Sequence, residues 1–100
     1  KNYVKAESEF LEVIKRTPYY NDSYLALMDM YWWSNQNKKG IAIGKKGLDN
    51  KVDTPDLGVK LAQAYFREAN YQMANKIIDS VLKKHPKQVE LIKIKKTFAQ

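Results

Sequence analysis

Apolar residues recur along this chain with the period of an α-helix. In two stretches they return at intervals of three and four positions, which places them on one helical face. These residues are Tyr24, Leu27, Met28 and Tyr31, and further along Leu61, Ala62, Tyr65 and Ala69. The whole pattern predicts six helices, over residues 3–16, 22–34, 38–50, 55–68, 71–84 and 88–99. Because the connections are short, we expect neighbouring helices to be antiparallel. The last range also permits a strand, since its apolar and polar residues nearly alternate.

The starts of two predicted helices carry recognisable signals. Thr54 is followed by Pro55 and Asp56. A hydroxyl side chain, a proline and an acid in this order are typical of an N-cap and a first helical turn. Residues 21–23, with the sequence Asn-Asp-Ser, are expected to open another helix in a similar way.

The apolar pattern returns at a fixed interval along the chain. A shift of 34 residues pairs Leu27 with Leu61, Met28 with Ala62 and Tyr31 with Tyr65. Twice that shift pairs Ala6, Phe10, Val13 and Pro18 with Ala74, Ile78, Val81 and Pro86. The equivalent positions of the repeat that lies between these two are Gly40, Gly44, Gly47 and Val52. A period of this length, about 34 residues, is typical of stacked helix pairs. We therefore interpret residues 1–100 as one domain: the second helix of a repeat (1–20), two full repeats (21–54 and 55–88), and a first or capping helix (89–100).

These residues resemble the tetratricopeptide repeat (TPR) family. Its unit carries a Trp/Leu/small/Tyr pattern on the first helix and an Ala/aromatic/Ala/Pro pattern on the second. Tyr24, Leu27, Met28 and Tyr31 fill the first pattern, whereas Gly58 stands in the Trp position of the next repeat. The resemblance covers essentially the whole chain. It implies an all-α fold, a short right-handed solenoid of antiparallel helix pairs.

A narrower similarity concerns the compartment. Residues 29–37 and Gly47-Leu48 look like the TPR segment that precedes an outer-membrane β-barrel in some bacterial proteins. That similarity implies a periplasmic location, and without it we expect a cytoplasmic one. The usual Trp-x-Gly turn is replaced here by residues 34–37, Ser-Asn-Gln-Asn. The chain begins at Lys1 without an initiator Met, and we expect it to be a piece of a longer protein.

The TPR resemblance also implies a function in protein–protein interaction or scaffolding. In that family the first helix of each pair lines a groove that holds a partner peptide. The matching positions are Asp22, Leu25, Asp29, Trp32 and Trp33 in one repeat and Asp56, Gln63, Phe66 and Arg67 in the next. Tryptophans are effective partner anchors, although Trp32 could instead belong to the core or to the turn after it. The family's clamp for a C-terminal carboxylate is not matched by Leu25 and Asp29.

Charge adds two alternative partners. Eighteen Lys and Arg against eleven Asp and Glu give a net charge of +7, which suits nucleic acid or an anionic membrane surface. In the middle repeat the excess lies on the second helix: Lys38, Lys39, Lys45, Lys46 and Lys51 against Asp49. Its first helix has Asp22 and Asp29 without a base. We therefore expect a basic convex face and a groove for an apolar or basic peptide. Binding through the basic second helices and the C-terminal helix, or self-association through open repeat ends, remains the alternative.

Catalytic and cofactor chemistry finds little support. The chain has no cysteine, and its one histidine, His85, stands beside Pro86 without a cluster of metal ligands. The string from Gly40 to Lys46 superficially resembles a phosphate-binding loop, but its spacing is one residue short and Lys46 replaces the required Ser or Thr. We expect neither an enzyme nor a cofactor. No apolar run approaches the roughly 20 residues of a membrane span.

Glycine forms a stripe on the third predicted helix. Gly40, Gly44 and Gly47 share one face, and each weakens a helix by roughly 1 kcal/mol relative to alanine. We favour a packing seam that admits bulky neighbours, with Gly58 extending it on the following helix. The alternative is a hinge between the two halves of the chain.

Overall fold

The computed structural model describes residues 3–52 and 54–98, without the side chains of residues 97 and 98. Six helices follow one another: α1 (Tyr3–Arg16), α2 (Asn21–Trp33), α3 (Asn37–Asp49), α4 (Pro55–Arg67), α5 (Tyr71–Lys84) and α6 (Val89–Phe98). No strand occurs in these ranges, so the all-α prediction is confirmed and the possible strand at the C-terminal end is a helix. The described helix ends lie within one residue of the predictions, and the predicted end at Ala99 is outside the described residues.

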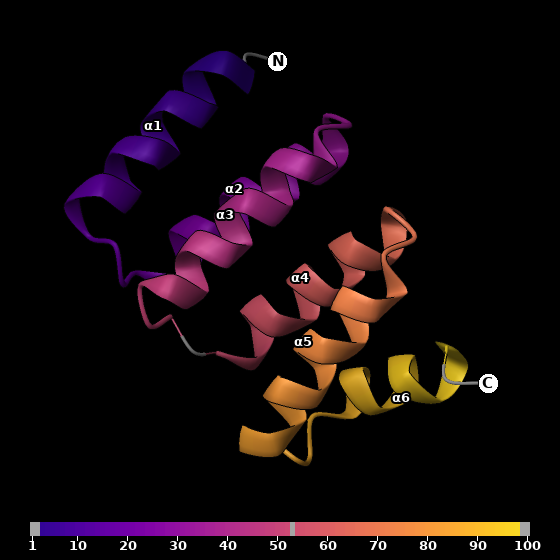
Figure 1. Ribbon diagram of the computed structural model, residues 1–100. Helices are drawn as coiled ribbons and strands as arrows, with labels where there is room; N and C mark the ends of the chain where they lie inside the picture. The colour runs from indigo at the N-terminus through magenta and orange to yellow at the C-terminus, as the bar shows by residue number, and fades with distance from the viewer. Residues whose placement is uncertain (1–2, 53, 99–100) are drawn as a thin grey trace.

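Each helix packs against the next along the chain, and α2 also contacts α4. Figure 1 shows this succession from α1 at the N-terminal end to α6 at the C-terminal end. The second helices start at Tyr3, Asn37 and Tyr71, and the first helices start at Asn21, Pro55 and Val89. Within each set the starts are evenly spaced, by the same interval that separates Leu27 from Leu61. The period of the sequence is therefore a period of the structure.

The core consists of two clusters that meet at Phe66 and Ile77. The larger cluster extends from α1 to α5 and includes the fully buried Tyr24, Leu27 and Leu61. The smaller cluster lies between α4, α5 and α6; its buried members are Val59, Ala62, Ile78, Val81 and Leu91. Within the described residues, no helix is both long and apolar enough to cross a bilayer.

The glycine stripe of α3 faces α2 and α4. A Cβ atom on Gly44 would lie 2.9 Å from Leu61 Cδ1 and 3.0 Å from Met28 Cε. A Cβ atom on Gly47 would lie 2.9 Å from Leu57 Cδ2 and 3.2 Å from Tyr24 Cδ1. These distances leave no room for a side chain, which supports a packing seam at both positions.

Gly58 belongs to a different contact. A Cβ atom there would overlap with Cγ2 of Val81, which lies on α5. The expectation that Gly58 extends the α3 seam is therefore wrong, because Gly58 serves the α4–α5 interface.

The two helix pairs distribute bulk in opposite ways. In the α2–α3 pair Tyr24 is large and packs on Gly47; at the equivalent positions of the α4–α5 pair Gly58 is small and Val81 is large. The same holds for a second set of equivalent positions. In the α2–α3 pair the large Met28 packs on Gly44, whereas in the α4–α5 pair the first residue is the small Ala62 and the second is the large Ile78. The glycines are thus the small halves of size-matched pairs.

Three turns place a residue other than glycine in the left-handed region. These residues are Asn35 (φ 60°), Lys51 (φ 68°) and Ala69 (φ 58°). After each of them the next N–H returns to the end of the preceding helix. Gln36 donates to the Tyr31 carbonyl oxygen at 2.7 Å, Val52 to that of Gly47 at 2.9 Å, and Asn70 to that of Tyr65 at 2.9 Å. This is the Schellman arrangement, in which glycine is the preferred residue. Asn35 fills the turn that the sequence left without a glycine.

Replacing Ala69 with glycine should stabilise the chain by about 0.5–1 kcal/mol, because alanine is strained at positive φ and glycine is not. Urea unfolding followed by circular dichroism measures this difference. The matched control is Ala42→Gly, which makes the same substitution at an exposed position inside α3. That control should destabilise by about 1 kcal/mol. A destabilising Ala69→Gly would contradict the strained turn.

The two predicted helix starts differ in the structure. Thr54 caps α4 as predicted, accepting a hydrogen bond from the Leu57 N–H at 3.3 Å. Residues 21–23 open α2 as predicted, but its N-cap is Tyr20, without a side-chain cap, so the prediction of a similar capping signal is wrong. The oxygen of Asn21 accepts a hydrogen bond from the Thr54 hydroxyl at 2.8 Å, which ties the starts of α2 and α4 together. His85 is the C-cap of α5.

Candidate functional site

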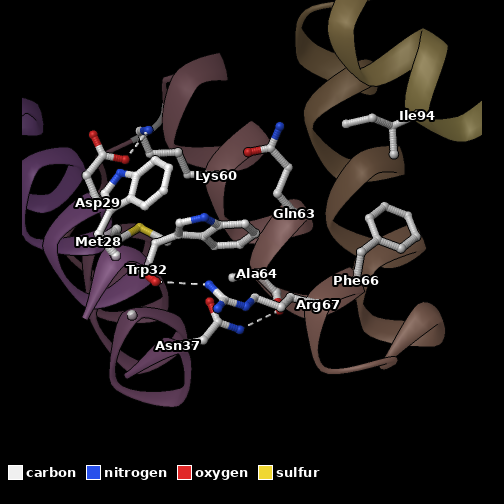
Figure 2. Close-up of a pocket in the computed structure, with 12 residues that line it drawn as sticks. Met28, Asp29, Trp32, Asn37, Lys60, Gln63, Ala64, Phe66, Arg67 and Ile94 are labelled. Atoms are coloured by element: carbon white, nitrogen blue, oxygen red, sulfur yellow. Dashed lines mark hydrogen bonds and ion pairs between the residues drawn. The ribbon is translucent and has the colours of Figure 1, made fainter. Parts of the chain in front are cut away.

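A groove of about 580 Å³ opens between α2 and α4. Residues from the start of α3 and from α6 complete its lining. The full set is Met28, Asp29, Trp32, Trp33, Asn37, Gly40, Lys60, Gln63, Ala64, Phe66, Arg67 and Ile94. Figure 2 shows Trp32 projecting from α2 toward α4, with Phe66 and Ile94 on the other side of the opening. We call this the α2–α4 groove.

The groove gathers six of the nine residues expected from the sequence. They form three equivalent pairs, each separated by one repeat period: Asp29 and Gln63, Trp32 and Phe66, and Trp33 and Arg67. Because α2 and α4 pack side by side, equivalent positions on the two helices face the same opening. The repeat period is therefore what brings these side chains together.

Arg67 is held against Trp32. Its guanidinium carbon lies 4.4 Å from the centre of the indole ring, a cation–π distance. The guanidinium also donates to the Trp32 carbonyl oxygen at 3.0 Å and to the Asn35 side-chain oxygen at 3.5 Å. Trp32 is half-buried and lines the groove. Both side chains are thus positioned before any partner arrives.

Lys60 was not expected in the groove. Its ammonium lies 2.5 Å from a carboxylate oxygen of Asp29, and a dashed line in Figure 2 marks this ion pair. Lys60 stands one turn before Gln63 on the same face of α4, and this spacing is the signal that could have identified it. With Asp29 opposed by Lys60 and Arg67, the lining carries more positive than negative charge. The expectation that acidic residues set the charge of this groove is therefore wrong.

Asn37 was also missed. Its side chain is buried and donates to the Ala64 carbonyl oxygen at 2.8 Å and to a Glu68 carboxylate oxygen at 2.9 Å. These bonds join the start of α3 to the end of α4 beneath the groove. A polar residue at the start of a helix gave no sequence signal for such a role.

The three remaining expected residues lie elsewhere. Leu25 and Asp56 line a smaller hollow of about 310 Å³, which shares Lys60 and Gln63 with the α2–α4 groove. Asp22 lines neither; it is exposed and accepts a hydrogen bond from the Tyr20 hydroxyl at 3.2 Å.

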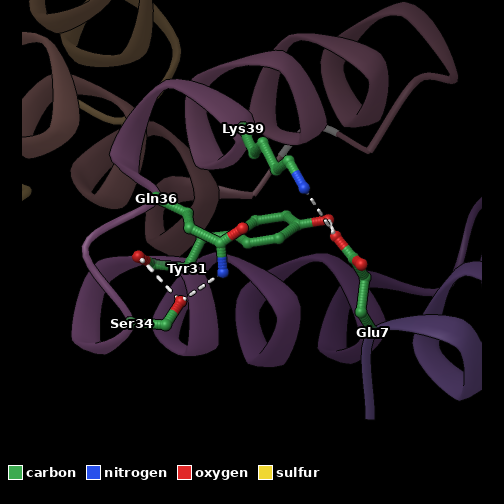
Figure 3. Close-up of polar contacts among 5 residues, drawn as sticks. All are labelled: Glu7, Tyr31, Ser34, Gln36 and Lys39. Atoms are coloured by element: carbon green, nitrogen blue, oxygen red, sulfur yellow. Dashed lines mark hydrogen bonds and ion pairs between the residues drawn. The ribbon is translucent and has the colours of Figure 1, made fainter. Parts of the chain in front are cut away.

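A polar cluster joins α1, α2 and α3. Figure 3 shows the Tyr31 hydroxyl pointing toward Glu7 of α1, with Lys39 of α3 beside them. Tyr31 donates to the Glu7 carboxylate at 2.6 Å, and the Lys39 ammonium lies 3.4 Å from the same oxygen. The Tyr31 bond, with help from Lys39, holds the pKa of Glu7 below its ordinary value, although partial burial opposes this. Burial and the bond to Glu7 raise the pKa of Tyr31.

Replacing Glu7 with glutamine should cost about 1 kcal/mol near pH 7, because the Tyr31 hydroxyl then loses a charged acceptor. A carboxyl with a lowered pKa in the folded state stabilises above its unfolded pKa and loses that contribution as the pH falls through the folded pKa. The cost should therefore shrink from about pH 5 to about pH 3. Urea unfolding at several pH values measures it. Glu9→Gln, on the exposed side of α1, is the control that should show no such loss.

Among the described residues, no three His, Cys, Asp or Glu side chains lie close enough together to hold a metal ion. Comparison with protein-family models, curated proteins and solved structures found no match for this chain.

Proposed function

We propose that this chain is a TPR-like solenoid module that binds a segment of a partner protein in the α2–α4 groove. The TPR resemblance supplies the expectation, and the gathering of six expected side chains in one groove is the observation that supports it. Such a module serves interaction or scaffolding and performs no reaction of its own.

The character of the lining suits recognition. Trp33 is 77% exposed at the mouth of the groove, whereas the interior is closed by Met28 and Ala64, both nearly inaccessible to solvent. Tryptophan and arginine side chains that line one groove are a typical composition for a binding hot spot. Leaving such an indole in water is costly in a monomer and useful to a binding surface.

Replacing Trp33 with alanine should weaken partner binding about tenfold or more while changing the free energy of unfolding by less than about 0.5 kcal/mol. The measurement is quantitative capture of partners from a lysate of the source cells, with urea unfolding in parallel. Tyr19→Ala is the matched control, because Tyr19 is 73% exposed and lies outside the groove.

Equal capture by the wild type and Trp33→Ala would contradict the proposal. Capture that survives Trp33→Ala but falls steeply with salt would instead favour the basic helices and an anionic partner.

A further inference from the structure

Gly40 differs from the other three glycines. A Cβ atom there would lie 3.5 Å from Tyr31 Cβ and 3.9 Å from the Met28 carbonyl oxygen, both ordinary contacts. The equivalent residues of the neighbouring repeats are Ala6 and Ala74. Since alanine is the better helix former and would fit, packing does not account for glycine at this position.

Gly40 lies in the floor of the α2–α4 groove. The buried lining residues are Met28, Asn37, Gly40 and Ala64, whereas Trp33, Gln63 and Arg67 are exposed at the rim. The floor is thus made of small or unbranched side chains, and the rim of larger ones. Because Gly40 has no side chain, it takes little volume from the groove that it lines.

The charges at the rim indicate which residue type stands next to the inserted side chain in a partner segment. Asp29 is paired with Lys60, so their charges offset each other. Arg67 contacts only neutral groups, the Trp32 ring and carbonyl oxygen and the Asn35 side chain, within the part of the chain that the structure describes. These contacts fix the guanidinium and leave further N–H donors for a carboxylate. Prior positioning lowers the entropic cost of binding one.

We propose that the groove receives a partner segment that inserts one large apolar side chain over Gly40 and places an adjacent carboxylate on Arg67. This rests on the proposed function and specifies its partner. Gly40 determines the depth of the socket and thereby the size of the side chain that it accepts, and Arg67 selects an acidic neighbour over a basic one.

Three short blocked peptides test the proposal: Ala-Glu-Phe-Glu-Ala, Ala-Lys-Phe-Lys-Ala and Ala-Glu-Ala-Glu-Ala. Titration into isotope-labelled protein, followed by the shifts of the Trp32 and Trp33 indole N–H signals in NMR spectra, gives each affinity. We expect the Glu-Phe-Glu peptide to bind about tenfold more tightly than the Lys-Phe-Lys peptide, and the peptide without phenylalanine to bind more weakly still.

Two variants separate the parts of the socket. Gly40→Ala should weaken the Glu-Phe-Glu peptide about tenfold while leaving the melting temperature unchanged or higher. Arg67→Gln should abolish the preference for Glu over Lys. Lys38→Gln is the matched control, because it removes the same charge from an exposed position outside the groove.

Equal binding of the Glu and Lys peptides, or full affinity in Gly40→Ala, would overturn the inference. If none of the peptides binds but Trp33→Ala still reduces partner capture, the inferred partner chemistry is wrong and the proposed function stands. If Trp33→Ala also has no effect, both fail.

Discussion

Replacing Gly44 with leucine is expected to destabilise the chain by about 3 kcal/mol or more, a large fraction of the stability of a small domain. The first added carbon would already lie 2.9 Å from Leu61 and 3.0 Å from Met28. Three further carbons have to enter the same closed contact between α2, α3 and α4. Leu61 is fully buried and Met28 is only 5% exposed, so both side chains have to repack to admit the leucine.

Urea unfolding of Gly44→Leu measures this loss directly. Ala42→Leu is the matched control, because Ala42 is exposed on the same helix. Its free energy of unfolding should change by less than about 0.5 kcal/mol, as is usual for a surface substitution. A tolerated leucine at residue 44 together with a tolerated control would show that α3 is free to move, as the hinge interpretation requires.

Replacing Gly58 with alanine is expected to cost about 2–3 kcal/mol, although alanine is the better helix former. The added methyl would overlap with Cγ2 of Val81 and lie 3.3 Å from its Cβ, the branched and least flexible part of that side chain. Either α4 and α5 separate, or Val81 leaves its preferred rotamer. Gly40→Ala, which meets only ordinary contacts, provides the same substitution without the overlap.

A second substitution tests the cause of that loss. Val81→Ala alone should cost about 2 kcal/mol through the cavity that it leaves. Combined with Gly58→Ala, the smaller residue removes the overlap and the added methyl fills part of the cavity. The double variant should therefore be more stable than the sum of the single losses by about 1 kcal/mol or more. Simple additivity would mean that the two residues do not share a contact.

Much of the fold could be predicted because its determinants are local and repeated. The spacing of Tyr24, Leu27, Met28 and Tyr31 fixes a helical face, and the repeat period fixes where each helix recurs. The cap of α2 could not be predicted from residues 21–23, because the oxygen of Asn21 bonds to Thr54, far along the chain, instead of capping its own helix.

The site was predictable where it follows the repeat and hidden where it depends on contacts between repeats. The pairs Trp32 and Phe66, and Trp33 and Arg67, could be placed by period alone. The roles of Lys60 and Asn37 depend on which side chains α2, α3 and α4 bring within reach of them. The charge of the groove could not be judged from its first helix alone, since both its cations lie on α4.

The opposite placement of bulk in the two helix pairs also limits how the chain can be rearranged. Repeat modules are usually regarded as exchangeable, yet α3 could not replace α5: Gly47 would then face Gly58 and leave a void. In the reverse exchange Val81 would collide with Tyr24. Each first helix thus accepts only its own second helix. This size matching disfavours the pairing of a first helix with the second helix of the other repeat while the chain folds.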